Sequence, residues 1–397
     1  MSKSRQFRIA YLDTHPVQYQ APLLRRIAEE PGIQLKAFFG SDISTRKFTD
    51  VGFQREICWD TPLCEGYDHE FLPALGGRDS VSFWVPFIYG LRDRLRRGKF
   101  DAVWVHGYMR SSHIIAMATA KSLGLRVFVR DDATLIGRPR GRVRLVAKEA
   151  FFQLLAKLVD GFLAVGTRNK EYYLNYGIEN ARVFSMPWAV DNQYFRSRAQ
   201  AATIDREKFR AELGLAINRP VILYVGKLLP RKRPKDLLDA WMQLYPELTH
   251  KTPYLLFVGD GELRVELEKL ASTIEGGSIR FIGFKNQSEL PAYYDLCDVF
   301  VMPTVFEPWG LVVNEVMNAG KAVIASDEVG CVPDLIFGGH NGFVYRARDI
   351  IALKETIRLA LANPLQLIAM GRRSLEIIDR WSFEEDVSGL RRAIGAV

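Results

Sequence analysis

The amino-acid sequence predicts an α/β protein made of two doubly wound parallel-sheet domains that face each other across a cleft. Along the 397 residues, short apolar runs alternate with segments of helical periodicity, which is typical of βαβ units. The alternation forms two series, each about half of the chain, and two sheets are more usual than one sheet with that many strands. Two of the expected strands run into motifs with glycine and charged residues, at the sheet edge where such folds bind ligands.

The expected elements follow from these patterns in chain order. In the first half we expect strands at 7–12, 33–39, 102–106, 127–129 and 161–165, and helices at 21–30, 111–123 and 143–158. In the second half we expect strands at 221–225, 254–258, 279–282, 299–302 and 322–325, and helices at 235–244, 263–273, 288–295, 311–319 and 350–362. Short strands separated by helices indicate parallel pairing, because a parallel pair needs a long crossover connection.

The domain boundary is expected in the polar stretch 196–218, where 204–213 has the pattern of a short helix. We place an N-terminal domain at 1–198 and a C-terminal domain at 199–380. A C-terminal helix at 381–397 is expected to cross back to the N-terminal domain. Two such domains would hold a ligand between the carboxyl ends of their strands.

The composition excludes several classes of protein. With 48% hydrophobic and 12% aromatic residues, the chain is neither disordered nor collagen-like. It has no run of 18 apolar residues, so no transmembrane helix is expected, and the apolar stretch 9–12 is too short for a signal peptide. The four cysteines lack zinc-ligand spacing, which favours reduced core thiols in a cytoplasmic protein.

The net charge of +8 is concentrated in one region. Residues 88–148 contain 14 basic and 4 acidic residues, whereas residues 196–397 contain 26 of each. This asymmetry suggests an anionic partner for the region, which could be a membrane, a nucleic acid or an acidic substrate. A solvated basic face with no partner is the alternative.

The strongest motif follows the expected strand 299–302 and reads PTVFEPWGLVVNE, ending at Glu315. Pro308 and Gly310 are suited to a helix start, where free N–H groups favour an anion such as a diphosphate. If the segment is helical throughout, Glu307 and Glu315 lie about 12 Å apart along it. One carboxylate could then bind a sugar and the other a ribose, with the diphosphate between them. Two ordinary acids at a helix start are the alternative.

The second motif reads VILYVGKLLPRKR and spans 221–233. Its four cations, at a strand end that should face the cleft, could neutralise a leaving diphosphate, although a solvated charge run would look the same. The chain contains no P-loop sequence, and GDGELR at 259–264 lacks the third glycine of a dinucleotide fingerprint.

Together these segments resemble a retaining glycosyltransferase of family 4, which has the GT-B fold of two Rossmann-like domains. The resemblance rests on GKLLPRK (226–232), FVGDGEL (257–263), FEPWGLVVNEVMNAGKAVIAS (306–326), VGCVPDLI (329–336), NGFVY (341–345) and, less specifically, PWAVDNQYF (187–195). It covers nearly all of the second domain and is thinner over the first.

The resemblance implies roles for the donor-side residues. Glu307 would contact the donor sugar and Glu315 the ribose. The diphosphate would be held by the backbone N–H groups of Gly310 and Leu311 and by the side chains of Lys227 and Lys232. Two residues depart from the family pattern: Lys227 stands where arginine is usual, and Arg231 where an acid is common. Because lysine lacks the bidentate fork of arginine, part of the phosphate affinity is expected to move to Arg231 or Arg233.

The acceptor-side residues are predicted from the ends of the first-domain strands. His106 corresponds to a family histidine near the reacting sugar, and a structural role is its alternative. His15 and Gln18 follow the first strand, where many relatives carry a glycine pair, and could line the acceptor site. The acceptor could also be bound by the Arg130-Asp131-Asp132 segment, whose alternative roles are a helix cap or a local ion pair.

We therefore expect an enzyme that transfers a sugar with retention from a nucleotide-diphosphate sugar, UDP-linked, to a hydroxyl acceptor that is lipid-linked or otherwise anionic. Glu307, His106 and Lys232 are the expected catalytic residues. The chain has no D-x-D triplet, so neither a metal nor a cofactor is expected. The alternatives are a nucleotide-sugar epimerase, a phosphorylase of the same fold, a non-catalytic sugar-nucleotide binder and, from a different class, a basic nucleic-acid-binding protein.

The cellular location and the partners are predicted from the basic region. Segments 82–99 and 138–155 combine aromatic and basic residues, a pattern of helices that lie on anionic lipid. We expect a cytoplasmic protein, either in solution or peripheral on the inner face of the membrane. Two ordinary amphipathic helices packed on the sheet, or a soluble anionic acceptor, would explain the same charge. A nucleic-acid partner is not expected, because no recognised binding motif accompanies the charge.

Overall fold

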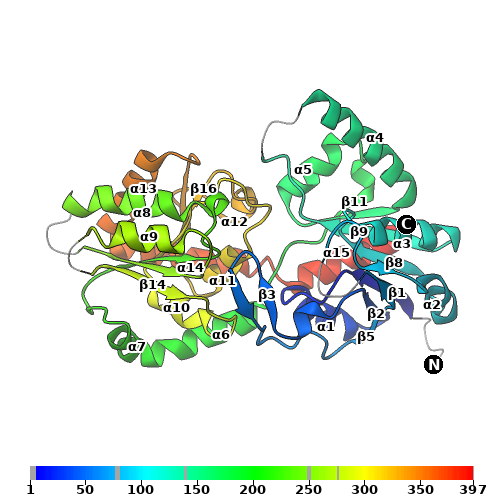
Figure 1. Cartoon of the computed structure of the whole chain (residues 1–397), viewed down its shortest axis with the longest axis horizontal. Helices are drawn as coiled ribbons and strands as arrows, with labels where there is room; N and C mark the ends of the chain where they lie inside the picture. Colours follow the sequence, from blue (N-terminus) through cyan, green and yellow to red (C-terminus); the bar gives the residue numbers. More distant parts are fainter. Residues whose placement is uncertain (1–5, 77–80, 138–140, 248–251, 275–276, 397) are drawn as a thin grey trace. The chain divides into compact units, whose positions relative to one another are not determined.

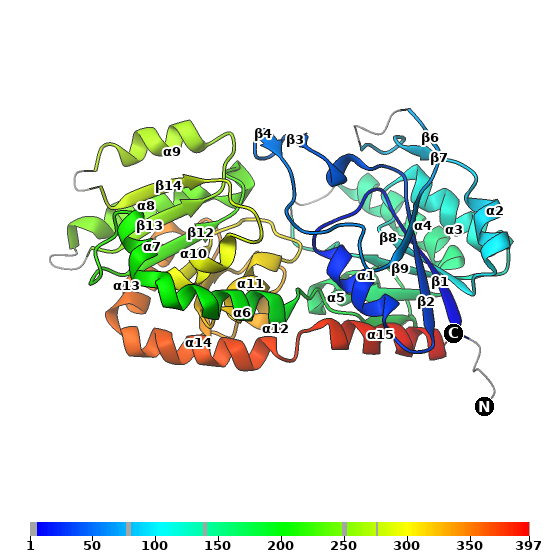
Figure 2. The same cartoon turned by 90° about the horizontal axis from the view of Figure 1, so that it is seen from below.

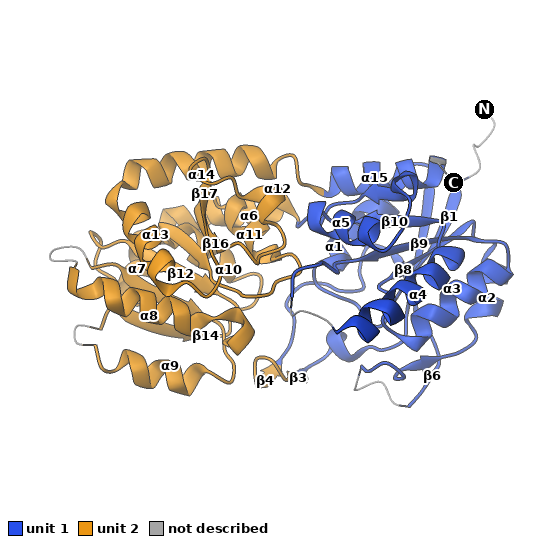
Figure 3. Ribbon diagram, turned by 90° about the horizontal axis from the view of Figure 1, so that it is seen from above, with its two compact units in different colours: residues 1–48, 57–190, 383–397 blue, residues 49–56, 191–382 orange. Residues whose placement is uncertain are grey.

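The computed structural model describes residues 6–76, 81–137, 141–247, 252–274 and 277–396. The chain forms two compact units (Figure 3). Unit 1 comprises 1–48, 57–190 and 383–397, and unit 2 comprises 49–56 and 191–382. Each unit contains one parallel sheet with helices packed against it, so the predicted class of two doubly wound α/β domains is confirmed.

Unit 1 is built on a seven-stranded sheet with the order β11-β10-β9-β8-β1-β2-β5 (Figure 1). Its strands are β1 (Phe7–Asp13), β2 (Ile33–Phe39), β5 (Asp68–Phe71), β8 (Ala102–His106), β9 (Arg126–Asp131), β10 (Gly161–Ala164) and β11 (Val183–Ser185). Its helices are α1 (Gln20–Ala28), α2 (Leu91–Gly98), α3 (Ser111–Ser122), α4 (Arg142–Leu158), α5 (Thr167–Asn175) and α15 (Phe383–Ala396). A small antiparallel pair, β6 (Ala74–Leu75) and β7 (Phe87–Ile88), lies outside the sheet.

The alternation of strand side chains divides the core of unit 1 between the two faces of the sheet. Val103 and Val105 of β8 pack in a cluster with residues of α2, α3, α4 and α5. Ala102 and Trp104 of the same strand belong to the other cluster, with residues of α1 and α15. Figure 2 shows α1 and α15 together on that second face.

Unit 2 is built on a six-stranded sheet with the order β14-β13-β12-β15-β16-β17. Its strands are β12 (Val221–Val225), β13 (Tyr254–Val258), β14 (Ile279–Gly283), β15 (Val299–Met302), β16 (Ala322–Ser326) and β17 (Gly342–Tyr345). Its helices are α6 (Asn192–Ala202), α7 (Arg206–Glu212), α8 (Pro234–Leu244), α9 (Arg264–Ala271), α10 (Leu290–Leu296), α11 (Leu311–Asn318), α12 (Val332–Leu335), α13 (Ile350–Ala362) and α14 (Pro364–Ile378). Two short strands, β3 (Phe48–Asp50) and β4 (Arg55–Ile57), pair at the ends of the inserted segment 49–56.

Both sheets reverse their strand order at one point. In unit 1 the chain first builds β1, β2 and β5 in one direction, and then adds β8 on the other side of β1. In unit 2 it builds β12, β13 and β14, and then adds β15 on the other side of β12. The crevice at such a switch point, outside the carboxyl ends of the strands, is where open α/β sheets bind ligands.

The unit boundaries differ from the predicted ones. The chain passes from unit 1 to unit 2 after residue 190, whereas the predicted boundary after residue 198 falls inside α6. The stretch looked like a linker because α6 is largely polar, but its Phe195 and Ala199 are buried. At the other end, unit 2 extends to residue 382, and residues 383–397 belong to unit 1.

The helix α15 is joined to the sheet of unit 1 by a fully buried ion pair. Arg130 Nη2 of β9 lies 2.7 Å from Asp386 Oδ1, and neither side chain is exposed. The same guanidinium donates to the carbonyl oxygens of Met186 and Pro187. Gly389 of α15 has no room for a Cβ, which would lie 1.9 Å from the carbonyl oxygen of Ser185. These contacts fix α15 closely against the end of the sheet.

Replacing Asp386 by alanine should therefore destabilise unit 1. The substitution leaves the Arg130 guanidinium buried without its counter-ion, and breaking one partner of a buried pair costs about 3–5 kcal/mol of unfolding free energy. Urea denaturation monitored by circular dichroism measures the effect. Glu384→Ala is the control, because Glu384 pairs with Arg26 at the surface, with its side chain 65% exposed, and should cost at most about 1 kcal/mol. Equal losses in the two variants would contradict the importance of the buried pair.

Candidate functional site

The switch point of unit 2 brings together the two charged motifs of the sequence. The loop after β12 carries a short 3₁₀ turn at Pro230–Lys232, and the loop after β15 carries Glu307. Because β12 and β15 are neighbours in the sheet, their following loops leave it side by side. Lys232 and Glu307, which are 75 residues apart in sequence, meet there.

Lys232 and Glu307 form an ion pair at this point. The Lys232 Nζ donates to Glu307 Oε2, and the side chains are 16% and 13% exposed. The guanidinium of Arg231 lies 3.8 Å from the same carboxylate oxygen and is more exposed. Burial lowers the pKa of Lys232, although the neighbouring Glu307 carboxylate opposes the change. The pair is thus sheltered from water. Charges interact more strongly in such an environment than at the surface, because the effective dielectric constant is lower.

The backbone around Glu307 is held by the loop that follows β16. The Glu307 N–H donates to the carbonyl of Glu328 at 3.2 Å, and the Gly330 N–H donates to the carbonyl of Glu307 at 2.9 Å. A Cβ on Gly330 would lie 1.8 Å from the carbonyl oxygen of Pro308, so only glycine fits this crossing. Two loops of the sheet edge thus fix the backbone that carries the glutamate.

The helix start that was predicted for diphosphate binding is present. Gly310 is the N-cap of α11 with a φ of 100°, a left-handed conformation that favours glycine, and Leu311 is the first helical residue. The preceding Trp309 donates from its indole to Asn314 and stacks on Trp381 at 5.4 Å. Residues 307–310 form a loop and α11 begins at Leu311, in agreement with the expected helix 311–319. The separation of about 12 Å, which holds only for a helix that includes Glu307, therefore does not apply.

Glu315 lies in the interior of unit 2. Its side chain is on α11, the residue is 1% exposed, and its carboxylate accepts a hydrogen bond from the Tyr294 hydroxyl of α10. A ribose contact would therefore require the residues that cover Glu315 to move.

Lys227 is paired with a carboxylate that sequence reasoning missed. Its Nζ lies 2.8 and 2.9 Å from the two carboxylate oxygens of Asp50, and 4.7 Å from the centre of the Phe53 ring. Asp50 Oδ1 also accepts from the backbone N–H groups of Gly52 and Phe53. The segment 49–56 carries no motif and lies far from Lys227 in sequence, so no local pattern could have indicated the pair.

The other two residues of the basic motif are placed differently from each other. Arg231 donates to the carbonyl of Phe306 and stays close to Glu307, whereas Arg233 pairs with Asp236 at 2.8 Å. Of the two arginines to which phosphate affinity was expected to move, Arg231 is therefore the one beside the Lys232–Glu307 pair.

The GDGE motif serves the packing of neighbouring loops. A Cβ on Gly259 would lie 1.9 Å from the carbonyl oxygen of Gly226, and one on Gly261 would lie 2.8 Å from that of Leu228. The Leu228 N–H donates to the carbonyl of Asp260 at 2.8 Å. These glycines let the loop after β13 support the loop that carries Lys227, which explains their spacing without a dinucleotide.

In unit 1, His106 lies at the end of β8, beside the switch point. The ring packs edge-on against Trp188 at 5.6 Å, and its Nδ1 has no hydrogen-bond partner among the described residues. Burial lowers the pKa of His106 to about 3, and the positive charges of Arg130 and His113 act in the same direction. The imidazole is therefore neutral at pH 7 and able to exchange a hydrogen bond with a hydroxyl group.

His15 and Gln18 follow β1 at the same edge of the sheet. His15 is half-buried, with Nδ1 3.0 Å from the hydroxyl of Thr14, and burial together with the charge of Arg110 lowers its pKa. Gln18 is half-buried in the turn before α1. The buried Asp13 precedes them, and burial raises its pKa to about 7.

The Arg130-Asp131-Asp132 segment is only partly available to a ligand. Arg130 is fully buried and paired with Asp386, so its predicted place on the acceptor side is wrong. Asp131 is half-buried and accepts from the Tyr173 hydroxyl and the Asn169 amide, and burial raises its pKa. Asp132 is exposed. Arg130 does form an ion pair, but with a residue 256 positions away and not within its own segment, as the alternative of a local ion pair supposed.

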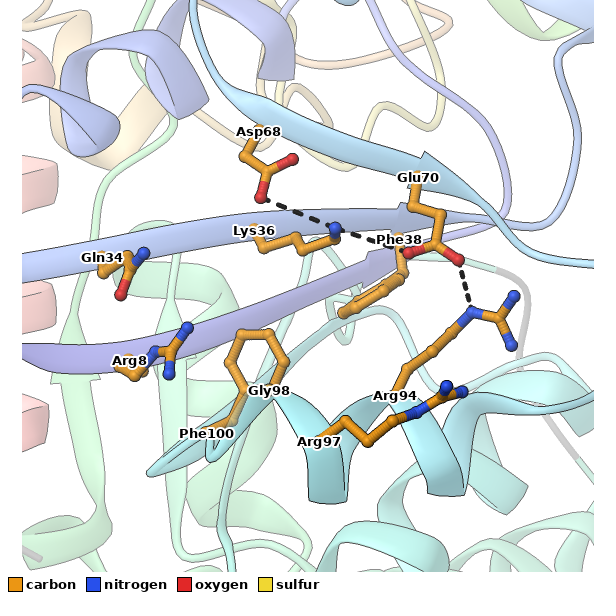
Figure 4. A pocket seen from close by; sticks show the side chains of 10 residues that line it. All are labelled: Arg8, Gln34, Lys36, Phe38, Asp68, Glu70, Arg94, Arg97, Gly98 and Phe100. Atoms are coloured by element: carbon orange, nitrogen blue, oxygen red, sulfur yellow. Dashed lines mark hydrogen bonds and ion pairs between the residues drawn. The ribbon is translucent and has the colours of Figure 1, made fainter.

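The basic charge of segment 88–148 is partly neutralised by acids from elsewhere in unit 1. A groove of about 500 Å³ lies over β1, β2 and β5 beside α2 (Figure 4), and in it Glu70 pairs with Arg94 of α2 and with Lys36. Lys121 pairs likewise with Asp160 at 2.7 Å. Arg94 and Lys121 thus contribute less to the predicted surplus, and residues 138–140 of this region lie outside the described residues.

Metal ligands, membrane-spanning helices and cysteines can be checked in the described part of the chain. No three His, Cys, Asp or Glu side chains gather there as a metal site would require. None of the described helices combines the length and the apolar character needed to cross a membrane. The four cysteines, all among the described residues, form no disulfide. Cys297 and Cys331 are buried as expected, Cys64 is half-buried, and Cys58 is exposed, so the expectation of a core position is wrong for Cys58.

Part of unit 2 is similar to a known protein family. Residues 205–375 match the model of the family described as Glycosyl transferases group 1. The match covers less than half of the chain and lies entirely within unit 2, so this segment is similar to a glycosyltransferase domain. The segment contains every predicted donor-side residue, from Lys227 to Glu315, whereas the predicted acceptor-side residues lie outside it.

Two curated relatives are similar over stretches longer than the matched segment. A GDP-mannose-dependent alpha-(1-6)-phosphatidylinositol monomannoside mannosyltransferase of Mycolicibacterium smegmatis is 29% identical over 54% of this chain and 58% of that relative. A D-inositol 3-phosphate glycosyltransferase of Catenulispora acidiphila is 29% identical over 87% of each chain. The chain thus spans less than two thirds of the first relative and most of the second.

The fold is shared with solved glycosyltransferase structures. The structure of HepE of Anabaena in complex with UDP superposes with a TM-score of 0.72 over 99% of this chain and 100% of that one, at 15% identity. At this level of identity the likeness shows the fold alone, which is the GT-B fold.

The low pKa of His106 predicts an acid-dependent loss of stability. A histidine in the unfolded chain titrates near 6.5, whereas His106 in the folded protein titrates near 3, so the unfolded state binds the extra proton between these values. The contribution of His106 to stability is thus complete above pH 6.5 and falls by up to about 1.4 kcal/mol per pH unit below it.

Urea denaturation of the wild type and of His106→Asn between pH 4 and 7 tests this. The advantage of the wild type over the variant should shrink as the pH falls. His113→Asn is the comparison, because the pKa of His113 is lowered to about 4 and its effect should saturate at a higher pH. A pH-independent difference for His106→Asn would show that the site is open to solvent.

Proposed function

We propose that the chain is a retaining, metal-independent glycosyltransferase that moves a sugar from a nucleotide-diphosphate sugar to a hydroxyl acceptor. The observation that carries the proposal is the sheltered Lys232–Glu307 pair at the switch point of a domain that matches group 1 glycosyltransferases. A carboxylate suited to sugar hydroxyls and cations suited to a diphosphate stand together there. Retention and membership of family 4 rest on the resemblance of the sequence motifs.

In the proposed reaction, the cations and the start of α11 assist departure of the nucleoside diphosphate. Arg231 and Lys232 would neutralise the negative charge that develops on the leaving phosphate, and the free N–H groups at the start of α11 would donate hydrogen bonds to its oxygens. Glu307 would orient the sugar through its hydroxyl groups. The acceptor oxygen forms the new bond to the anomeric carbon on the face that the phosphate leaves, and the phosphate takes the acceptor proton.

In this structure two carboxylates pair with the cations to which a negatively charged phosphate would bind. Both oxygens of Asp50 contact the ammonium group of Lys227, and Glu307 pairs with that of Lys232. A bound diphosphate would therefore compete with Asp50 for Lys227. Release of Glu307 from Lys232 would in turn free its oxygens for the sugar hydroxyls.

For the nucleotide we propose uridine. The Anabaena neighbour is a complex with UDP, whereas the mycobacterial relative is named for GDP-mannose, so the two comparisons point to different bases. A thermal-shift panel of UDP-, GDP- and ADP-sugars decides between them, because a ligand that binds the folded state stabilises it in proportion to the logarithm of concentration over Kd. Turnover of the donor in the absence of any acceptor would favour an epimerase instead.

Glu307→Ala should abolish sugar transfer, with a loss of at least about 100-fold, because the substitution removes the carboxylate that is proposed to orient the donor sugar. Lys232→Ala should weaken UDP binding by about tenfold or more, through loss of a charge-assisted contact. Product formation and UDP titration measure the two effects, and circular dichroism checks the fold.

The matched control is Glu328→Gln, in the same group of loops. Glu328 pairs with Arg348 away from the Lys232–Glu307 pair, and its side-chain substitution leaves the backbone contact with Glu307 in place. It should transfer sugar at the wild-type rate. Wild-type turnover by Glu307→Ala would overturn the assignment of the donor site.

For the acceptor we propose a lipid-linked or anionic molecule reached at a membrane surface, in agreement with a peripheral cytoplasmic location. The support is the amino-terminal half of α4, which is almost entirely exposed between Arg142 and Ala147. Val143 is 83% and Val146 64% exposed, with Arg142 and Arg144 beside them. Exposed apolar side chains interleaved with arginine are suited to the interface of an anionic bilayer.

Val146→Glu should reduce binding to vesicles that contain phosphatidylglycerol by about fivefold or more, because the substitution removes an apolar contact and adds a negative charge. Cosedimentation with such vesicles at low and high salt measures the effect. Ile351→Glu on α13 is the control, because Ile351 is similarly exposed, at 68%, on the other unit. Equal vesicle binding by the wild type and Val146→Glu would favour a soluble anionic acceptor.

A further inference from the structure

Unit 2 contains a second pocket, at the opposite end of its sheet from the Lys232–Glu307 pair. The pocket has a volume of about 920 Å³, within the range of small-molecule sites. Segments that precede three of the strands line it: 217–220 before β12, 297–298 before β15 and 319–321 before β16. The remaining walls come from α7, from the end of α13 and from α14. We call it the basic pocket.

The charge of the basic pocket is strongly unbalanced. Its lining includes six cations and two acids: Arg206, Arg210, Arg219, Lys321, Arg358 and Arg372, with Glu247 and Asp298. Arg206 and Arg358 have carboxylate partners, and Glu247 is itself paired with Lys354. The other four cations form no ion pair among the described residues, so a surplus of positive charge remains.

Arg210 is a buried cation of the basic pocket that has no ion-pair partner among the described residues. It is 7% exposed, and its Nη2 donates to the carbonyl oxygens of Ala216 and Arg219 at 2.6 and 2.7 Å. Its Nε has no partner among the described residues. Carbonyl groups satisfy hydrogen bonds but carry no net charge, so the guanidinium stays buried without a counter-ion, which is costly. An anion in the pocket would offset that cost.

Apolar side chains complete the lining. Ile217 and Ile368 are 67% and 55% exposed, and Leu361, Leu367 and Leu375 also line the pocket. Large exposed apolar residues beside unpaired cations indicate a ligand with both an apolar part and a negative charge.

We propose that the basic pocket binds a small amphipathic anion, with a phosphate or carboxylate group against the cations and an apolar body against Ile217 and Ile368. The site is separate from the donor site, because the strands β12 and β15 run from one to the other. The proposal does not depend on the sugar-transfer reaction. Its test therefore measures binding, not activity.

The probe is octyl phosphate, added to the full chain below the concentration at which it forms micelles, with binding followed by calorimetry. We expect saturable binding that weakens as salt is raised. Inorganic phosphate and octyl glucoside, which each lack one half of the probe, should bind about tenfold more weakly or not at all. Absence of octyl phosphate binding, or equally tight binding of either half, overturns the proposal.

Two variants locate the probe. Arg372→Gln and Ile368→Asn alter the charged and the apolar side of the pocket, and each should weaken octyl phosphate binding by about five- to tenfold. Arg373→Gln is the control, because the neighbouring Arg373 donates to the carbonyl of His340 and does not line the pocket. It should bind as the wild type does. Unchanged binding by both pocket variants overturns the proposal.

A competition experiment separates this site from the donor site. Saturating UDP should leave the affinity for octyl phosphate unchanged, and Lys232→Ala should bind the probe as the wild type does. Displacement of the probe by UDP would place it beside Lys232 and overturn the proposal. These outcomes are independent of whether the chain transfers a sugar, so a failure here leaves the proposed function untouched.

Discussion

The reversal of strand order at β12 is the constraint from which the site of unit 2 follows. The strands β13 and β14 lie on one side of β12, and the reversal places β15 on the other. The loops after β12 and β15 therefore leave adjacent strands at the same end of the sheet. Lys232 and Glu307, which are 75 residues apart in sequence, meet between these loops and remain largely covered. The glycines at 259 and 330 are secondary to this arrangement, since they let the neighbouring loops close around it.

The same arrangement explains why the cations of the basic motif do not repel one another strongly. Lys227 and Lys232 each have a carboxylate from a different segment, and Arg231 shares the oxygen of Glu307. A site that binds a doubly or triply charged ligand must remain stable when empty, and internal acids supply that stability. A phosphate must compete with these acids for the cations. The affinity of the site for a phosphate is therefore the difference in free energy between the cation–phosphate pairs that form and the cation–carboxylate pairs that break.

Most of the fold was predictable from local patterns, because buried parallel strands are short apolar runs and the helices between them are periodic. Strands such as Asp68–Phe71 and Val183–Ser185 escaped prediction because they are short and lie at or next to the sheet edges, where polar residues are tolerated. The sequence indicated Lys232 and Glu307 separately, from the motifs on their own loops. It could not indicate Asp50 for Lys227 or Asp386 for Arg130, because these pairs join distant segments that have no periodicity in common.

The helix α15 has a consequence for the order in which the protein folds. Val387, Leu390 and Ala393 cover the face of the first sheet that Ile9 and Trp104 help to form, yet they are synthesised after all of residues 191–382. Domains usually fold as they leave the ribosome. Until the second unit has been made, helix α1 is the part of the helical cover of this face that the chain already contains, and the area of α15 stays open. The nascent chain therefore exposes apolar residues of this face for longer than those of the opposite face, whose helices all precede residue 191.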